Sequence, residues 1–189
     1  MVIISPKRTS PIFHFLSMIW AEAVQHYYGG LNMSDIRITQ EDPTSVSATG
    51  LIRDLSAELA GRYPNSHGGD GAGAFKPADV QIPRAAFVVA WLNDEAVGCG
   101  ALRPMDEDDT VEVKRMFVRP TARRQGISRV ILTALENLAR EFGFQKVRLE
   151  TGTRNPEALA LYGASGYEPI PCYGIYVNEP LSRCFEKML

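Results

Sequence analysis

The spacing of hydrophobic residues along the chain predicts three helices. Within residues 43–63 leucines recur every four positions, the repeat of one helix face. A third helix is expected to begin at Asn155-Pro156-Glu157, an Asn cap followed by a proline and an acid, and to end at Gly166. Between them, the clearest series follows the i, i+3, i+4, i+7 rule without a miss and stops before Gly143: Ile127, Val130, Ile131, Ala134, Leu135, Leu138, Ala139 and Phe142.

Alternating or short apolar runs between these helices predict strands. They lie near residues 34–39, 87–92, 96–102, 110–119 and 146–151, with two short strands in 167–189. The second and third runs flank Asn93-Asp94-Glu95, as in a β-hairpin. The resulting order is strand, helix, hairpin, strand, helix, strand, helix, strands. It predicts an α/β (α+β) fold in which a mixed sheet carries helices on its faces.

The strand expected before the longest helix contains a break in its alternation. Val111 and Val113 share one face, whereas Met116 and Val118 are out of phase with them. A one-residue slip of this kind is typical of a β-bulge. We therefore expect a bend near residues 114–115, and bulges are common beside active sites.

Composition and charge restrict the classes of protein. The 189 residues, 45% hydrophobic and 22% charged, suit one folded domain with a short appendage. The net charge of -2 provides no overall attraction to nucleic acid or an anionic membrane, so any polyanion needs a local basic cluster. Cys99, Cys172 and Cys184 are too few and too widely spaced to indicate a disulfide framework or a CxxC site. With only three histidines, no metal site is expected, and we expect a cytoplasmic protein. Cys172 is expected in a pocket or loop, and the other two cysteines are expected to be core residues.

Residues 1–33 differ in pattern from the rest of the chain. Lys7 and Arg8 precede an apolar run at 12–21, which is too short to span a membrane. Followed by Ala21-Glu22-Ala23, this run loosely resembles a secretory signal. A non-core extension ahead of an alternative start at Met33 is the interpretation we favour, with the working domain over residues 34–189.

The turn that leads into the longest helix carries the most informative chemistry. A helix N-terminus has unpaired N–H groups and about half a positive charge, so it binds anions. Gly126 allows a phosphate to approach the backbone closely, and small Ser128 keeps the next position open. Nearby positive charge comes from Arg115, Arg119, Arg123, Arg124 and Arg129. We predict a site for a multi-phosphate group, with a solvated arginine cluster as the alternative.

Other phosphate-binding and nucleic-acid motifs fit the chain poorly. No G-K-[ST] follows a glycine loop, and a lone Gly126 is not the GxGxxG fingerprint. The glycine-rich segment 65–73 follows a helix and precedes prolines, so a surface loop is favoured over a phosphate cradle. The basic run lacks the interleaved aromatic residues of a single-strand nucleic-acid platform.

These residues resemble the GNAT superfamily of N-acetyltransferases. Arg123-Arg124-Gln125-Gly126-Ile127-Ser128 matches its [QR]-x-x-G-x-[GA] acetyl-CoA signature, except that Ser128 replaces the final Gly or Ala. Residues 111–120 resemble the family's fourth strand, and residues 155–167 are similar to its N-x-x-A-x-x-L-Y-x-x-x-G-[FY] motif. The resemblance covers residues 34–189. It implies a mostly antiparallel mixed sheet of about six or seven strands, with helices on both faces and a bulged, splayed central strand.

The resemblance also implies which residues bind acetyl-CoA as cosubstrate. The pantetheine arm would lie along the splayed edge, bonded to the backbone of Phe117 and Val118, with a contact from Asn155 beside its capping role. A nearby backbone N–H would polarise the thioester carbonyl. Arginines such as Arg123 would screen the outer phosphates. Backbone N–H groups would bind the pyrophosphate at Arg124, Gln125, Gly126, Ile127 and Ser128.

In this family the acceptor amine attacks the thioester directly. Glu112 lies where some members carry the general base, and a surface carboxylate is its other interpretation. Tyr162 lies where the family's general acid protonates the departing thiolate, and a packing tyrosine is the alternative. Tyr173 and Tyr176 could flank the acceptor or cover apolar surface, and residues 65–73 and 171–176 are expected to set substrate choice.

The implied function is acetyl-CoA-dependent transfer of an acetyl group to a primary amine of a small molecule, such as an amino acid, polyamine or aminoglycoside. A protein or peptide N-acetyltransferase and a non-catalytic acyl-CoA-binding sensor are the alternatives, because a fold alone does not determine function. No metal, nucleic-acid or membrane partner is expected, and a homodimer is left open.

Overall fold

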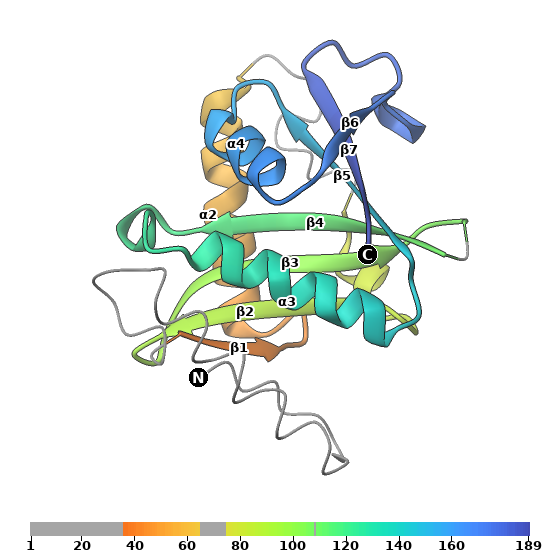
Figure 1. The fold of residues 1–189 in the computed structure, drawn as a ribbon. Coiled ribbons are helices and arrows are strands. Elements are labelled where there is room, and N and C mark those ends of the chain that lie inside the picture. Colours follow the sequence, from red (N-terminus) through yellow and green to blue (C-terminus); the bar gives the residue numbers. More distant parts are fainter. Residues whose placement is uncertain (1–35, 65–74, 108) are drawn as a thin grey trace.

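A computed structural model describes residues 36–64, 75–107 and 109–189 of the chain (Figure 1). Within these ranges no helix is both long enough and apolar enough to cross a membrane. The predictions for residues 1–33 and for the glycine-rich segment 65–73 lie outside them. The helices are α2 (Val46–Arg62), α3 (Ile127–Glu141) and α4 (Pro156–Ala164), with short 3-10 turns η3 (Pro77–Val80), η4 (Pro120–Ala122) and η5 (Gly174–Tyr176).

The seven strands form one sheet in the order β1-β2-β3-β4-β5-β7-β6. Neighbouring strands run antiparallel except β4 and β5, which are parallel and connected through α3. The predicted mixed, mostly antiparallel sheet is confirmed, and Figure 1 shows α2 and α3 on opposite faces of it. The strands are β1 (Ile36–Gln40), β2 (Ala86–Leu92), β3 (Glu95–Pro104), β4 (Thr110–Val118), β5 (Lys146–Gly152), β6 (Glu168–Ile170) and β7 (Ser182–Met188).

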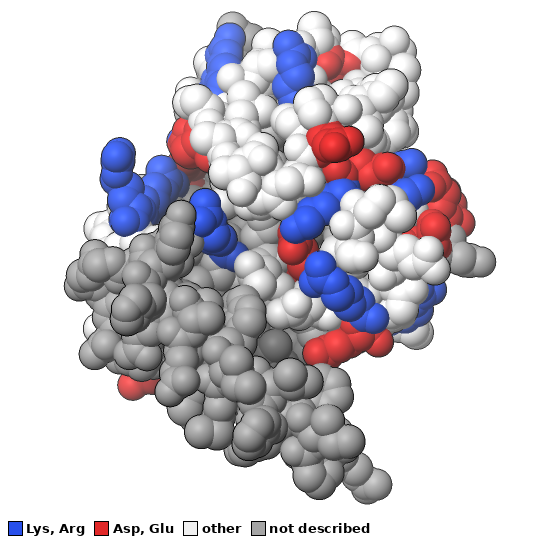
Figure 2. Space-filling view, in the orientation of Figure 1, with Lys and Arg blue, Asp and Glu red and all other residues white. Residues whose placement is uncertain are grey.

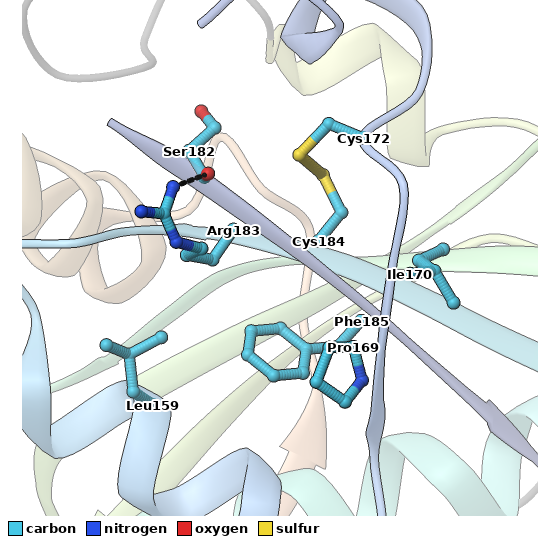
Figure 3. Close-up of a pocket in the computed structure, with 8 residues that line it drawn as sticks. All are labelled: Leu159, Pro169, Ile170, Cys172, Ser182, Arg183, Cys184 and Phe185. Atoms are coloured by element: carbon cyan, nitrogen blue, oxygen red, sulfur yellow. Dashed lines mark hydrogen bonds between the residues drawn. A yellow bond between two sulfur atoms is a disulfide. The ribbon is translucent and has the colours of Figure 1, made fainter. Parts of the chain in front are cut away.

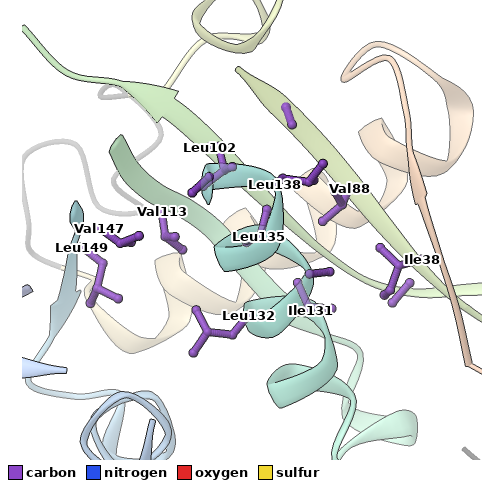
Figure 4. Packing of buried hydrophobic residues seen from close by; sticks show 14 of the residues in the cluster. Ile38, Val88, Leu102, Val113, Ile131, Leu132, Leu135, Leu138, Val147 and Leu149 are labelled. Carbon is purple, nitrogen blue, oxygen red and sulfur yellow. The ribbon is translucent and has the colours of Figure 1, made fainter. Parts of the chain in front are cut away.

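The apolar face of α3 packs on the sheet and forms the larger core (Figure 4). Ile131 and Leu135 are fully buried, as the helical spacing of the sequence predicts. The helix comes close to β3 because the strand carries Gly100 there: a Cβ on Gly100 would lie 2.8 Å from Leu135 Cδ1. Burial of apolar area at about 25 cal/mol per Å² drives this docking.

The opposite face of the sheet is covered by α2. Its N-cap is Ser45, whose Oγ accepts a hydrogen bond from the Ala48 N–H at 3.2 Å. Leu51 and Leu55 are buried in a second hydrophobic cluster with side chains of β2, β3 and β4, including Phe87 and Phe117. Both faces of the sheet therefore have their own core, and β4 is held from both sides.

The strands β4 and β5 pair only over their first halves. The parallel ladder joins residues 110–113 to residues 146–149, and beyond it the two strands separate (Figure 1). On its other side β4 stays paired with β3 but shifts register, because Ala101 faces Lys114 while Cys99 faces Phe117. Arg115 takes up the extra length with φ of 55°. The predicted bulge at residues 114–115 is confirmed, and the β5-facing edge of β4 has no strand partner beyond Val113 within the described ranges.

The C-terminal strands bring two cysteines together. Antiparallel pairing of β6 with β7 sets Ile170 opposite Cys184, and Cys172 lies two residues further along. Cys172 and Cys184 form a disulfide with Cα atoms 5.1 Å apart. The sequence indicated no disulfide, and that expectation is wrong because strand pairing, not sequence spacing, determines which cysteines meet. Cys99 is buried and free, as expected of a core residue.

Candidate active site

The turn after β4 presents backbone amides at the start of α3. Arg124 and Gly126 both have left-handed backbone conformations, with φ of 62° and 77°. Gly126 is the N-cap of α3, and no side chain caps the helix there. The first N–H groups of a helix have no intrahelical partners, so the amides of Ile127 and Ser128 can bind an anion. The turn therefore leaves backbone amides without intrahelical partners, and phosphate binding by them stays a prediction.

The arginines of this turn divide into two groups. Arg119 pairs with Asp54 of α2, at 3.1 Å between Nε and Oδ2, and with Glu95 of β3 at 3.2 Å. Arg123 donates from Nε to the Val118 carbonyl at 2.8 Å and pairs with Glu58 of α2. Arg119 and Arg123 thus have acidic partners within the protein, and their screening of phosphates stays a prediction. Arg124 is exposed, and Figure 2 shows basic side chains gathered at the edge of the molecule where this turn lies.

The edge of β4 leading back from the turn is buried and partly unpaired. Phe117 and Val118 pair with Cys99 and Gly98 of β3, leaving their other edge toward the gap between β4 and β5. Gly98 fits tightly there, because a Cβ on it would lie 2.7 Å from the Phe117 carbonyl oxygen. An extended, polar chain can hydrogen-bond along such an edge as an added strand does.

Glu112 lies in a buried ionic cluster rather than on the surface. Its side chain is 1% exposed. One carboxylate oxygen pairs with the Arg103 guanidinium, and the other accepts from the Tyr173 hydroxyl at 3.0 Å and lies 3.7 Å from Lys114 Nζ. The Lys114 ammonium also donates to the Tyr176 hydroxyl. The alternative interpretation of Glu112 as a surface carboxylate is excluded, and both of its oxygens already have partners.

Glu150 is a second carboxylate on this face that the sequence analysis did not single out. It follows the last β4–β5 pair, Val113 with Leu149, so it lies where the strands begin to separate. Its Oε1 accepts from the Ser182 hydroxyl at 2.6 Å. Burial raises the pKa of Glu150 above its ordinary value, although the Ser182 hydrogen bond acts in the opposite direction. No signal in the sequence singles it out, because Glu150 shares the polar positions of an alternating strand with Lys146 and Arg148.

Tyr162 of α4 is buried close to Glu150. Its side chain is 4% exposed, and its ring contacts those of Tyr167 and Phe185 at centroid distances of 5.8 and 6.3 Å. Burial, with a smaller contribution from the negative charge of Glu150, raises the pKa of Tyr162. The hydroxyl therefore holds its proton throughout the neutral range, the state that a proton donor needs.

Asn155 occupies the N-cap position of α4 but its side chain does not cap the helix. Its Oδ1 accepts from Arg62 Nη1 at 2.8 Å, and its Nδ2 donates to Thr151 Oγ1 at 3.4 Å. The capping expectation is therefore wrong at the level of the side chain. Arg62 also pairs with Glu58, so α2 connects the start of α4 to Arg123 of the turn.

A pocket of ≈ 400 Å³ opens between α4 and the β6–β7 pair (Figure 3). None of the residues predicted for catalysis or acetyl-CoA binding lines this pocket, so we do not assign the acetyl-transfer site to it. Cys172 is on its wall, as expected of a pocket residue. The described ranges hold no group of three or more His, Cys, Asp or Glu side chains that could bind a metal ion. The lining residues are Leu159, Pro169, Ile170, Cys172, Ser182, Arg183, Cys184 and Phe185.

Comparison with known proteins gives a consistent result. Residues 52–167 match the acetyltransferase (GNAT) family. An IAA acetyltransferase from Azospirillum brasilense is 36% identical over 83% of this chain and 100% of its own length. The structure of a putative acyl-CoA N-acyltransferase from Klebsiella pneumoniae superposes with a TM-score of 0.67 at 31% identity, over 82% of this chain and 97% of that one. A GNAT family acetyltransferase from Elizabethkingia anophelis with acetyl-CoA bound shares the fold at 20% identity, with a TM-score of 0.59 over 82% of this chain and 99% of that one.

Proposed function

The chain belongs to the acetyltransferase (GNAT) family, and from that premise we propose that it transfers the acetyl group of acetyl-CoA directly to a primary amine of a small molecule. The observation that carries this proposal is the alignment of two features on one strand. At one end of the unpaired β4 edge lies the amide-lined turn at residues 124–128, and at the other end lies a buried set of titratable side chains. One extended thioester can span both.

The phosphates of acetyl-CoA bind at the turn. Backbone N–H groups of Gln125, Gly126, Ile127 and Ser128 hold the pyrophosphate, and exposed Arg124 lies beside it. The pantetheine arm follows the backbone of Phe117 and Val118 toward the bulge. This direction brings the thioester to the point where β4 and β5 separate, next to Glu150 and Tyr162.

The general base is better placed at Glu150 than at Glu112. Both oxygens of Glu112 are already engaged, one by Arg103 and the other by Lys114 and the Tyr173 hydroxyl. Glu150 has a raised pKa and one hydrogen bond from Ser182. A base whose pKa is raised toward neutrality accepts a proton more readily from an ammonium ion. Glu112 remains the residue that organises Arg103 and Lys114.

The proton balance then follows from these residues. The acceptor arrives as an ammonium ion, and Glu150 takes one proton so that the nitrogen lone pair can attack the thioester carbonyl. The C–N bond forms, the C–S bond breaks, and Tyr162 gives its proton to the departing CoA thiolate. The tyrosinate takes the second nitrogen proton from the new amide and so regains its neutral form, and Glu150 releases the first proton to solvent. The products are an N-acetylated amine and free CoA.

A small acceptor is supported by the enclosure of the site. Tyr173 and Tyr176 cover it with rings 5.7 Å apart in an edge-on arrangement, and both hydroxyls contact the buried cluster. A protein acceptor would need a wider groove at this point. The Azospirillum brasilense relative carries IAA in its name, so that acceptor belongs in the test panel.

The test is release of CoA thiol from acetyl-CoA with a panel of amines, IAA and peptides. General acid–base catalysis typically contributes about 10²–10⁴-fold, so Tyr162→Phe and Glu150→Gln should each lower kcat by at least about 10²-fold with CoA affinity retained. Glu112→Gln should instead raise the acceptor KM. Glu141→Gln is the matched control because Glu141 is an exposed carboxylate at the end of α3. Full activity of Glu150→Gln would refute the assignment of the base, and tight CoA binding without transfer to any acceptor would favour a sensor.

A further inference from the structure

Lys114 lies where the reacting end of the thioester is expected. It is the first β4 residue beyond the last parallel pair with β5, and the last residue paired with β3 before the bulge. Its side chain is on the same face of the sheet as Glu112, two positions earlier on the strand. From Val118 to Lys114 is four residues of strand, roughly 13 Å. A cosubstrate that enters at the turn and follows this edge thus reaches Lys114.

The surroundings of the Lys114 amine resemble a site for an acceptor amine. Its side chain is 10% exposed, and Nζ lies 3.7 Å from Glu112 Oε1 and 5.0 Å from the ring centroid of Tyr176. It donates to the Tyr176 hydroxyl, and Glu150 contributes a second negative charge nearby. Carboxylates and aromatic rings around a primary amine are what recognition of an alkyl ammonium group requires.

The same surroundings favour the nucleophilic form of the amine. Burial lowers the pKa of Lys114, and the positive charges of Arg103 and Arg115 act in the same direction, against Glu112 and Glu150. Desolvated lysines close to other cations are the ones that serve as nucleophiles, because a larger fraction is neutral. Lys76 is an exposed lysine of the same chain and serves as the reference amine in the experiment below.

We propose that Lys114 is itself an acetyl acceptor, so that the enzyme acetylates this side chain from bound acetyl-CoA when no external amine occupies the site. This inference rests on the acetyl transfer proposed above. The Lys114 nitrogen attacks the thioester carbonyl, the C–N bond forms as the C–S bond breaks, and CoA leaves as the thiol. Of the two protons that the ammonium loses, one reaches the CoA thiolate through the protein and one reaches solvent.

Acetylation would remove the positive charge of Lys114 from the buried cluster. The product is a neutral amide, so Glu112 would lose one of its two cationic partners and keep only Arg103. The added acetyl group would occupy the space in front of Tyr176 and exclude an external amine. Modification of Lys114 therefore lowers turnover, which makes the enzyme sensitive to the ratio of acetyl-CoA to acceptor.

The experiment is incubation of the full chain with acetyl-CoA alone, followed by intact-mass and peptide mass spectrometry over time. We expect one acetyl group per chain at Lys114, formed at least about tenfold faster than at Lys76, because the intramolecular amine is held beside the thioester. Addition of the best acceptor amine should slow the modification by competition. Tyr162→Phe should slow it together with turnover, and Lys114→Arg should remove it.

The possible outcomes distinguish failure of the Lys114 proposal from failure of the proposed acetyl transfer. Turnover of external amines with Lys114 unmodified would overturn the inference and leave the proposed function standing. Equal acetylation of Lys114 and Lys76 would also overturn it, because it would indicate chemical acetylation without the site. Absence of both self-acetylation and acceptor turnover would overturn the inference and the proposed function together.

Discussion

Reduction of the Cys172–Cys184 disulfide should lower the free energy of unfolding by an amount that follows from the length of the loop it closes. The two residues are 12 positions apart in the sequence, and the bond closes the loop that carries Tyr173 and Tyr176. A cross-link of this loop length removes conformational entropy from the unfolded chain worth about 3 kcal/mol. Since small domains are stable by only about 5–15 kcal/mol, this is a substantial fraction of the total.

The assay is urea unfolding at neutral pH with and without a dithiol reductant. The oxidised protein should unfold with a free energy about 3 kcal/mol larger than the reduced one. Reductant should have no further effect on Cys172→Ser, which is the matched control because it removes the bond without touching Cys99. Reduction should also raise the acceptor KM more than it lowers kcat, because Tyr173 and Tyr176 lose one anchor of their loop.

Thiol counting provides an independent check. The chain has three cysteines, and Cys99 is the free one in the structure. Denatured, unreduced protein should therefore react with alkylating reagent at Cys99 alone. Three reactive thiols, or an unfolding free energy that does not change with reductant, would refute the reasoning.

Two further predictions follow from particular residues. The pKa of Glu150 is raised in the folded state, so the neutral carboxyl is tolerated at low pH and stability is lost as pH rises through the folded pKa. Glu150→Gln, which cannot ionise, should therefore be more stable than the wild type at about pH 7 and little different at about pH 4, measured by thermal unfolding; equal differences at both pH values would contradict this. Gly126→Ala should cost roughly 1–2 kcal/mol through its left-handed backbone and weaken CoA binding roughly tenfold by calorimetry. Gly143→Ala carries the same backbone strain away from the turn, so an equal loss of CoA affinity there would contradict a specific role for Gly126.

Local patterns in the sequence were sufficient for much of the fold. The helix at residues 127–141, the bulge at residues 114–115 and the order of elements all follow from periodicity or from a single slip in it. The turn for which phosphate binding is predicted was equally accessible, because its parts are contiguous: a strand, a glycine and a helix N-terminus within a dozen residues. A motif made of neighbouring residues can be identified from the sequence without knowing which distant residues contact each other.

The remaining features depended on contacts between distant parts of the chain. Arg123 pairs with Glu58, 65 residues away, a partner that the local sequence does not indicate. Tyr173 reaches Glu112, 61 residues away, and helps to enclose a carboxylate that the sequence left open as a general base or a surface residue. Cys172 meets Cys184 through strand pairing. Glu150 became a candidate only once the structure placed it where β5 separates from β4. Sequence periodicity tells which face of an element is buried, whereas the partner on that face is decided by how the whole sheet packs, and the protonation and charge of a buried side chain depend on that partner.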